Sequence, residues 1–283
     1  MARVLIAGCG YVGEAAADAF HERSWNVEGW TATAESAAKL SGRPYAVRAV
    51  DVTDESAVSG AARGFDVVIH CVSSRGGDEE QYRRLYFEGA RSLLRAFPGA
   101  TLFFTSSTSV YPQVDGSVVD ENSPAEPRHA KGKILRETEE LVLAAKGIVA
   151  RLGGIHGPQR SFFLSRFLEG KTRPETNDRL INQVHRDDIV SALLLLADRR
   201  ADFRGEVFNV VGDQPVKASA AYEWLSARLK TPLVSDAAEA RPRKRGESNK
   251  RVSNQKLRAL GWEPRYPTFE SAMRESILPS FGF

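Results

Sequence analysis

Three glycines near the start of the chain, Gly8, Gly10 and Gly13, have a spacing that could hold a phosphate group. The apolar run 3–7 before them is typical of a buried strand, and the segment 14–23 after them has the pattern of a helix. In such a unit Gly8 allows a tight turn, Gly10 lets the backbone approach a ligand, and Gly13 lets the helix pack on the strand. Unpaired N–H groups and the dipole at the helix start favour negative charge. The spacing therefore predicts a dinucleotide site whose diphosphate contacts Gly8, Gly10, Tyr11, Val12 and Gly13.

The end of the second expected strand, 26–31, bears on which dinucleotide would bind. NAD-selective sites carry an acidic residue about 20 residues after the glycines, where it binds the ribose 2′-hydroxyl. This chain has Thr31, Ala32 and Thr33 there instead. Because no carboxylate would repel a 2′-phosphate, we expect NADP, with NAD as the alternative, and Thr31 and Thr33 as contacts. A plain polar turn is the other interpretation of the two threonines.

The pattern that must position these residues is an alternation of strands and helices. Further strands are expected at 45–52, 66–71, 101–106, 148–152 and 206–210, with helices at 55–63, 81–97, 132–146 and 187–198. This rhythm predicts a doubly wound α/β fold with a parallel sheet, the Rossmann type. The alternation of strands and helices breaks down in two stretches that prolines interrupt. We therefore expect a dinucleotide-binding domain over 1–152 plus 180–211, and a smaller discontinuous substrate lobe over 153–179 plus 212–283.

The composition of the chain indicates which kinds of binding partner are expected. The 283 residues carry a net charge of +3, which is too small to argue for nucleic acid. No apolar run is long enough to span a membrane, and no signal peptide is expected. Two cysteines give no metal-type spacing and no disulfide framework, so we expect no metal and a cytoplasmic, reducing setting. A small molecule is the expected partner, and a homodimer is left open.

Several motifs follow one another in an order that resembles a known family. They are Ser106-Ser-Thr-Ser-Val-Tyr111, Glu121-x-x-Pro124-x-x-Pro127, Arg151-x-Gly-Gly-Ile-x-Gly157-Pro158, His185-x-Asp187-Asp188 and Ser253-Asn-Gln-Lys256-Leu-x-x-Leu260-Gly261-Trp262-x-Pro264. Together with the glycines they make the chain similar to an extended short-chain dehydrogenase/reductase of the NAD-dependent epimerase/dehydratase family. The likeness is nearest to its atypical, YeeZ-like branch, whose catalytic residues are poorly kept.

The resemblance implies further contacts with a bound dinucleotide and a substrate. By analogy, the adenine would meet Asp51 and Val52, and the ribose Cys71, Val72 and Ser73. Lys133 would hold the nicotinamide ribose, while Gly154 and Ile155 approach the ring. Substrate contacts would come from Ser107, Tyr111, Arg160 and Arg245, and the solvated-loop interpretation remains open for the basic residues 241–251.

The resemblance also implies a catalytic set, from which one member is missing. Ser107, four residues before Tyr111, corresponds to the family's hydroxyl that orients the substrate, and Lys133 is the counterpart of its lysine. The family's acid/base tyrosine stands four residues before that lysine, but here the position holds His129. His129 could replace it, because imidazole titrates near neutrality. Alternatively Tyr111, His156 or Ser107 does the acid/base work, or the site only binds cofactor.

These features lead to one expected activity and one alternative. We expect an NAD(P)-dependent oxidoreductase or epimerase acting on a carbonyl or secondary alcohol, including that of a nucleotide sugar or another anionic small molecule. Elimination of water is disfavoured, because Thr108 and Ser109 stand where the related dehydratases carry two acids. The alternative is a non-catalytic NAD(P)-binding protein that reports redox state to a partner.

Overall fold

The centre of the molecule is a parallel sheet of seven strands. The computed structural model describes residues 1–74, 76–172, 178–233 and 248–283. The strands, in the order β11-β7-β5-β4-β1-β2-β3, are Val207–Val210, Ile148–Leu152, Thr101–Ser107, Val67–His70, Arg3–Ala7, Asn26–Thr31 and Ala46–Ala49. All neighbouring pairs are parallel. The order reverses between β1 and β4, and ligands of such sheets bind outside the carboxyl ends of the strands near that point. The predicted doubly wound α/β fold is confirmed.

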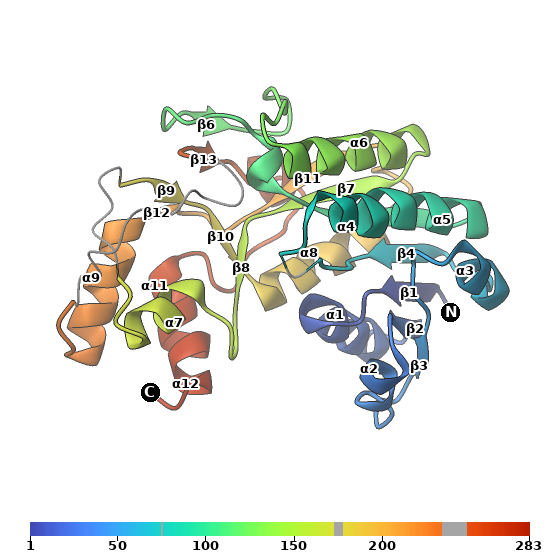
Figure 1. The fold of residues 1–283 in the computed structure, drawn as a ribbon, viewed down its shortest axis with the longest axis horizontal. Helices are drawn as coiled ribbons and strands as arrows, with labels where there is room; N and C mark the ends of the chain where they lie inside the picture. Colours follow the sequence, from blue (N-terminus) through green and yellow to red (C-terminus); the bar gives the residue numbers. More distant parts are fainter. Residues whose placement is uncertain (75, 173–177, 234–247) are drawn as a thin grey trace.

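Helices cover both faces of this sheet (Figure 1). Residues alternate along β1, so that Val4 and Ile6 pack with one set of helices while Leu5 and Ala7 pack with the other. The first set comprises α1 (Tyr11–Glu22) and α8 (Arg186–Asp198). The second comprises α3 (Glu55–Ala61), α4 (Glu79–Tyr82), the π-helical turn Arg83–Glu88, α5 (Gly89–Ala96) and α6 (Ala130–Ala144). The sheet therefore supplies two apolar cores from one set of strands.

A third apolar cluster lies apart from the sheet. It joins α7 (Phe162–Leu168), α9 (Ala218–Leu229), α11 (Phe269–Ala272), the π-helical turn Met273–Ile277 and α12 (Leu278–Ser280). These helices gather at the end of the molecule opposite α1 and α2 (Ala34–Ala38) (Figure 1). Leu257 of α10 (Gln255–Arg258) and Trp262 pack instead with the α1 face of the sheet. The boundaries proposed for the two lobes stay a prediction.

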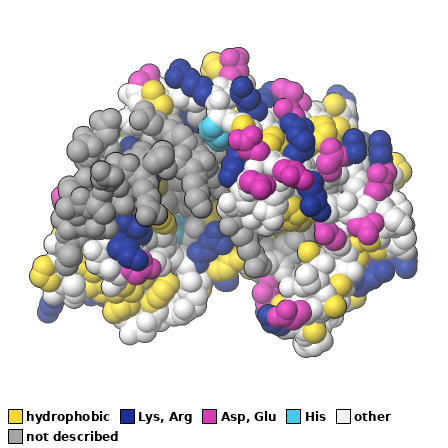
Figure 2. All heavy atoms as spheres, in the orientation of Figure 1, with side chains coloured by type: hydrophobic (Ala, Val, Ile, Leu, Met, Phe, Trp, Pro, Cys, Tyr) yellow, Lys and Arg dark blue, Asp and Glu magenta, His cyan; other side chains and the backbone are white. Residues whose placement is uncertain are grey.

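Three short strand pairs lie outside the large sheet. They are β8 (Gly154–His156) with β10 (Gln183–His185), β9 (Leu180–Ile181) with β12 (Val216–Lys217), and β6 (Val118–Val119) with β13 (Arg251–Val252). In Figure 2 the molecule has a notch at its lower edge, between the part formed by α7 and α12 and the part formed by α1 and α2. Within the described ranges, none of the helices combines the length and the apolar character needed to cross a membrane.

Candidate active site

The three glycines of the turn between β1 and α1 differ in the space around them. Gly8 has a φ of +101°, and a Cβ on it would lie 2.6 Å from the backbone nitrogen of Val72. A Cβ on Gly13 would lie 2.2 Å from the carbonyl oxygen of Gly8, so that α1 can pack on β1 only without one. A Cβ on Gly10 would meet no atom of the described chain within 4 Å. Gly10 also precedes α1 without any side-chain cap. The first N–H groups of α1 therefore adjoin open space that suits a diphosphate.

Tyr11 links this turn to a loop far along the chain. Its hydroxyl donates to the carbonyl oxygen of Pro158 at 3.0 Å, and a Cβ on Gly157 would lie 2.6 Å from the same hydroxyl. The guanidinium groups of Arg160 and Arg186 stack on the ring, 5.1 and 5.2 Å from its centroid. Burial raises the pKa of Tyr11 to about 12. Arg160, expected among the substrate contacts, thus lies beside the dinucleotide turn.

The residues expected around the adenosine end form ordinary turns. Thr31 donates its hydroxyl to the carbonyl oxygen of Thr33 at 3.1 Å, and Thr33 caps α2 by accepting from the N–H of Ser36. Asp51 accepts from the N–H of Thr53 at 2.9 Å, and Val52 is buried in the second core. Both threonines therefore have a local structural role, which the polar-turn interpretation anticipates.

Cys71, at the end of β4, lies against the glycine turn. Its thiol donates to the carbonyl oxygen of Gly8 at 3.3 Å, while the backbone of Val72 leaves no room for a side chain at Gly8. Ser73, next along the chain, is exposed. Burial raises the pKa of the Cys71 thiol, and that of Cys9 to about 12. Both thiols stay protonated near neutral pH and act as packing groups.

A cleft of about 760 Å³ opens beside the carboxyl ends of β5 and β7. Its walls bring together segments that are distant in the sequence: 107–109 with Tyr111, Pro112 and Val114, then 127–129, 153–155, Phe162 and Phe163, 179–183, and Ser248 with Lys250. Among the described residues of this lining, three are cations and none is a carboxylate. The structure therefore brings Ser107, Tyr111, His129, Gly154 and Ile155 to one cleft. Arg245 lies outside the described residues.

Ser107 and His129 line the cleft, and each caps the start of a helical segment. The hydroxyl oxygen of Ser107 accepts from the N–H of Ser109 at 3.2 Å, at the start of the 3₁₀ turn Thr108–Val110. Its own O–H can still donate. Nδ1 of His129 accepts from the N–H of Gly132 at 2.9 Å and so caps α6. The neutral ring therefore carries its proton on Nε2, which makes it a hydrogen-bond donor. Using Nδ1 as a base would break the cap.

Lys133 lies outside this cleft. Its side chain is exposed and lines a separate hollow of about 270 Å³ with Glu79, Arg83 and Glu137. Leu135, two residues further on, is buried against the sheet, and two residues correspond to about 200° of rotation around a helix. The sequence alone could not show this orientation. Of the three expected catalytic residues, the cleft thus contains Ser107 and His129 only.

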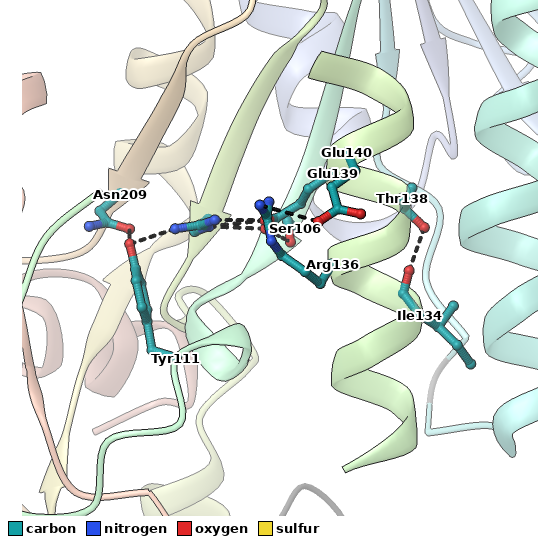
Figure 3. A network of polar contacts seen from close by, with 9 residues as sticks. Ser106, Tyr111, Ile134, Arg136, Thr138, Glu139, Glu140 and Asn209 are labelled. Carbon is teal, nitrogen blue, oxygen red and sulfur yellow. Dashed lines mark hydrogen bonds and ion pairs between the residues drawn. The ribbon is translucent and has the colours of Figure 1, made fainter. Parts of the chain in front are cut away.

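Tyr111, an alternative acid/base group, is held by a buried polar network (Figure 3). Its hydroxyl accepts from Nη1 of Arg151 and donates to Oδ1 of Asn209, both at 2.9 Å. Arg151 in turn donates to the buried carboxylate of Glu139 at 2.7 Å, and Ser106 donates to the same carboxylate at 2.6 Å. Burial raises the pKa of Tyr111, so that its proton is held near neutral pH. Ser106, Tyr111 and Arg151 belong to motifs of the sequence, but Glu139 and Asn209 do not, so the network itself was not predicted.

His156, the other alternative, is buried outside the cleft lining. Burial lowers its pKa to about 3, and its ring lies 5.9 Å from that of His185, whose pKa burial lowers to about 4. Nδ1 of His185 accepts from the N–H of Asp187 at 3.1 Å. Both rings are therefore neutral near pH 7, and His156 is a poor proton donor there.

These buried histidines predict a loss of stability in mild acid. Unfolded, each would bind a proton near pH 6.5, whereas folded it does so only near pH 3–4. Their contribution is thus present above pH 6.5 and is lost as the pH falls below it. Burial raises the pKa of Asp188 to about 6, which offsets part of the loss. Burial also lowers the pKa of His70 to about 4, so a third histidine contributes in the same direction. We expect the free energy of unfolding to fall by roughly 4 kcal/mol from pH 7 to 5. Urea unfolding at both pH values checks this, and equal midpoints and slopes would contradict it.

Comparison with known proteins agrees with this geometry. Residues 4–211 match the model of the NAD dependent epimerase/dehydratase family. The protein YeeZ of Escherichia coli (strain K12) is 28% identical over 280 residues, covering 94% of this chain and 97% of YeeZ.

Two solved structures share the fold at low identity. The dTDP-glucose 4,6-dehydratase of Bacillus anthracis, in complex with NAD, has a TM-score of 0.84 at 16% identity, covering 100% of this chain and 97% of its own. The UDP-glucose 4-epimerase of Thermotoga maritima, with UDP-glucose, has a TM-score of 0.83 at 19% identity, covering 99% and 98%. The resemblance expected from the motifs is confirmed, and the chain belongs to the NAD dependent epimerase/dehydratase family.

Proposed function

We propose that the protein is an NAD(P)-dependent oxidoreductase or epimerase that acts on a carbonyl or secondary alcohol of an anionic small molecule. The observation that carries the proposal is the cleft, where Ser107 at the end of β5 adjoins Gly154 and Ile155. A hydroxyl there can donate to a substrate oxygen, and the two backbone positions can approach a nicotinamide ring. The absence of carboxylates from the described lining supports an anionic substrate.

The glycine turn fits the diphosphate of the cofactor. Gly8 and Gly13 have no room for a Cβ, whereas the space at Gly10 is open, and the N–H groups of Tyr11, Val12 and Gly13 begin α1. When bound, the nicotinamide supplies a hydride donor or acceptor. We favour NADP over NAD, because no acid follows β2 to repel a 2′-phosphate. NAD binding by the Bacillus anthracis dehydratase keeps NAD as the alternative.

Two side chains would position the substrate oxygen. Ser107 would donate its O–H, since its oxygen already accepts from Ser109. His129 would donate through Nε2, since Nδ1 caps α6. We assign no role in the cleft to Lys133, whose side chain lines another surface.

A redox-sensing function is the second candidate, and the position of Lys133 favours it. Lys133 is exposed on another surface and the Tyr111 hydroxyl is held by Arg151, so the described cleft does not pair a tyrosine hydroxyl with Lys133. A sensor needs the dinucleotide turn but no proton transfer.

Turnover separates the two candidates. Oxidation of NADPH and, in parallel, NADH should be measured with a panel of aldehydes, ketones and nucleotide sugars for wild type and His129→Ala. Because an epimerase returns the hydride to its substrate, epimerisation of the nucleotide sugars should be followed by chromatography in the same samples. We expect turnover of at least one anionic substrate, and a roughly 10²-fold lower kcat in the variant. His21→Ala, the same change in the last turn of α1 and outside the cleft lining, is the control. Tight cofactor binding without turnover would favour the sensor, and unchanged kcat in His129→Ala would remove His129 from the mechanism.

A further inference from the structure

One cation of the cleft, Lys250, is buried rather than solvated. Its side chain lies in the cleft wall with 2% of the residue exposed, so the solvated-loop interpretation is wrong for it. The ammonium donates to the carbonyl oxygen of Tyr111 at 2.8 Å and to the hydroxyl oxygen of Ser248 at 2.9 Å. An ammonium has three N–H donors. One donor is therefore left for a further acceptor.

The charge of Lys250 has no negative partner in the described part of the chain. No aspartate or glutamate there forms an ion pair with it, and the neighbouring charge that acts on it is the cation Arg179. Arg128 and Arg179 add two more positive charges to the same wall. Burying an ammonium without a counter-ion costs several kcal/mol. Desolvation and Arg179 accordingly lower the pKa of Lys250 to about 8.

Three hydrogen bonds hold the backbone and the neighbouring residues of Lys250 in place. Asn182 donates to the carbonyl oxygen of Lys250 at 2.9 Å and accepts from the N–H of Val252 at 2.8 Å. The side chain of Asn249 accepts from the N–H of Leu180 at 3.0 Å. The ammonium is thus held in place before any ligand arrives, which limits the entropy lost on binding.

We propose that Lys250 is the anion-binding residue of this cleft and contacts a phosphate, sulfate or carboxylate group of the substrate. A preformed, desolvated cation beside Arg179 attracts an anion more strongly than an exposed lysine does. The inference rests on the proposed function for the existence of a small-molecule site, and it adds which group of the chain selects the charge of the substrate.

Sulfate is a suitable probe, because it stays a dianion throughout the neutral and alkaline range. Its binding to protein saturated with NADPH should be measured by calorimetry for wild type, Lys250→Met and Lys250→Arg. We expect at least a tenfold weaker affinity in Lys250→Met and a largely retained one in Lys250→Arg. The exposed, ion-paired Lys39 gives the control Lys39→Met, which should bind as wild type does. Phosphate and acetate in parallel show which anion class is preferred.

A pH series on the wild type tests the proposal without any substitution. Sulfate affinity should be constant from pH 7 to 7.5 and fall about tenfold per pH unit above pH 8.5, as Lys250 loses its proton. The other described titratable or charged groups that face the cleft are Arg128, Arg179, Tyr111 and His129, and burial raises the pKa of Tyr111.

Two results would overturn the proposal. One is equal sulfate affinity in wild type and Lys250→Met, which would make Lys250 a structural tether of Tyr111. The other is a sulfate affinity that does not change between pH 7 and 9.5. Because NADPH affinity is measured first in each variant, failure of the cofactor site would be seen separately.

Discussion

Replacing Glu139 by glutamine is expected to lower the free energy of unfolding by about 3–5 kcal/mol. The carboxylate is fully buried in α6 and pairs with the buried guanidinium of Arg151 on β7 at 2.7 Å. Glutamine keeps the shape but removes the charge, so Arg151 would remain buried without its counter-ion. Urea unfolding monitored by tryptophan fluorescence measures the effect.

The neighbouring Glu140 provides a matched control for this change. It lies on the same helix, but its side chain is 61% exposed and pairs with Arg136 at 3.4 Å. Glu140→Gln should therefore cost less than about 1 kcal/mol. If both variants lost a similar free energy of unfolding, the buried ion pair would contribute no more to stability than the exposed one. The double variant Glu139→Leu with Arg151→Leu should be more stable than the sum of its single changes predicts.

Gly10→Ala is expected to weaken cofactor binding at least 100-fold, about 2.7 kcal/mol, while the protein stays folded. The added methyl group would meet no atom of the described chain within 4 Å, and the backbone of Gly10 has a negative φ of −106°. It would instead occupy the space that a diphosphate needs at the start of α1. Titration of NADPH and NADH by calorimetry measures the loss.

A second glycine with open space around it serves as a control, because it shows whether any glycine-to-alanine change would weaken cofactor binding. Gly60 lies in α3, and a Cβ there also meets nothing within 4 Å. Gly60→Ala should leave cofactor affinity unchanged and raise helix stability by up to ~1 kcal/mol. Cofactor affinity of wild-type strength in Gly10→Ala would show that the dinucleotide does not approach this turn.

Much of the fold could be predicted because buried parallel strands have a strong local pattern. The expected ranges 3–7, 26–31 and 148–152 agree with β1, β2 and β7 residue by residue. The expected helix 81–97 contains a π-helical turn at Arg83–Glu88 with Tyr86 buried, a widening that no periodicity signals. The two-residue strands were not predicted, because they are too short to show alternation.

The site could be predicted in part, for a similar reason. Glycines that are sterically required can be recognised from their spacing in the sequence, as Gly8 and Gly13 are. The direction of a helical side chain, in contrast, depends on which face of the helix packs against the rest of the protein. Lys133 and Lys250 illustrate this. Lys133 was expected to hold the nicotinamide ribose and is exposed on another surface, while Lys250, for which a solvated loop was one interpretation, is buried. The Glu139–Arg151 pair joins residues 12 apart in the sequence. Arg151 begins one of the motifs, but nothing in the sequence identifies Glu139 as its partner.

The helices of the third cluster come from three widely separated portions of the chain, around 162–168, 218–229 and 269–280. Between them the chain returns to the large sheet through α8 and β11. Exchange of one continuous gene segment between relatives therefore could not transfer this cluster as a whole. Its divergence must proceed by point substitutions and by changes in loop length, made piecemeal in segments that have to remain mutually compatible.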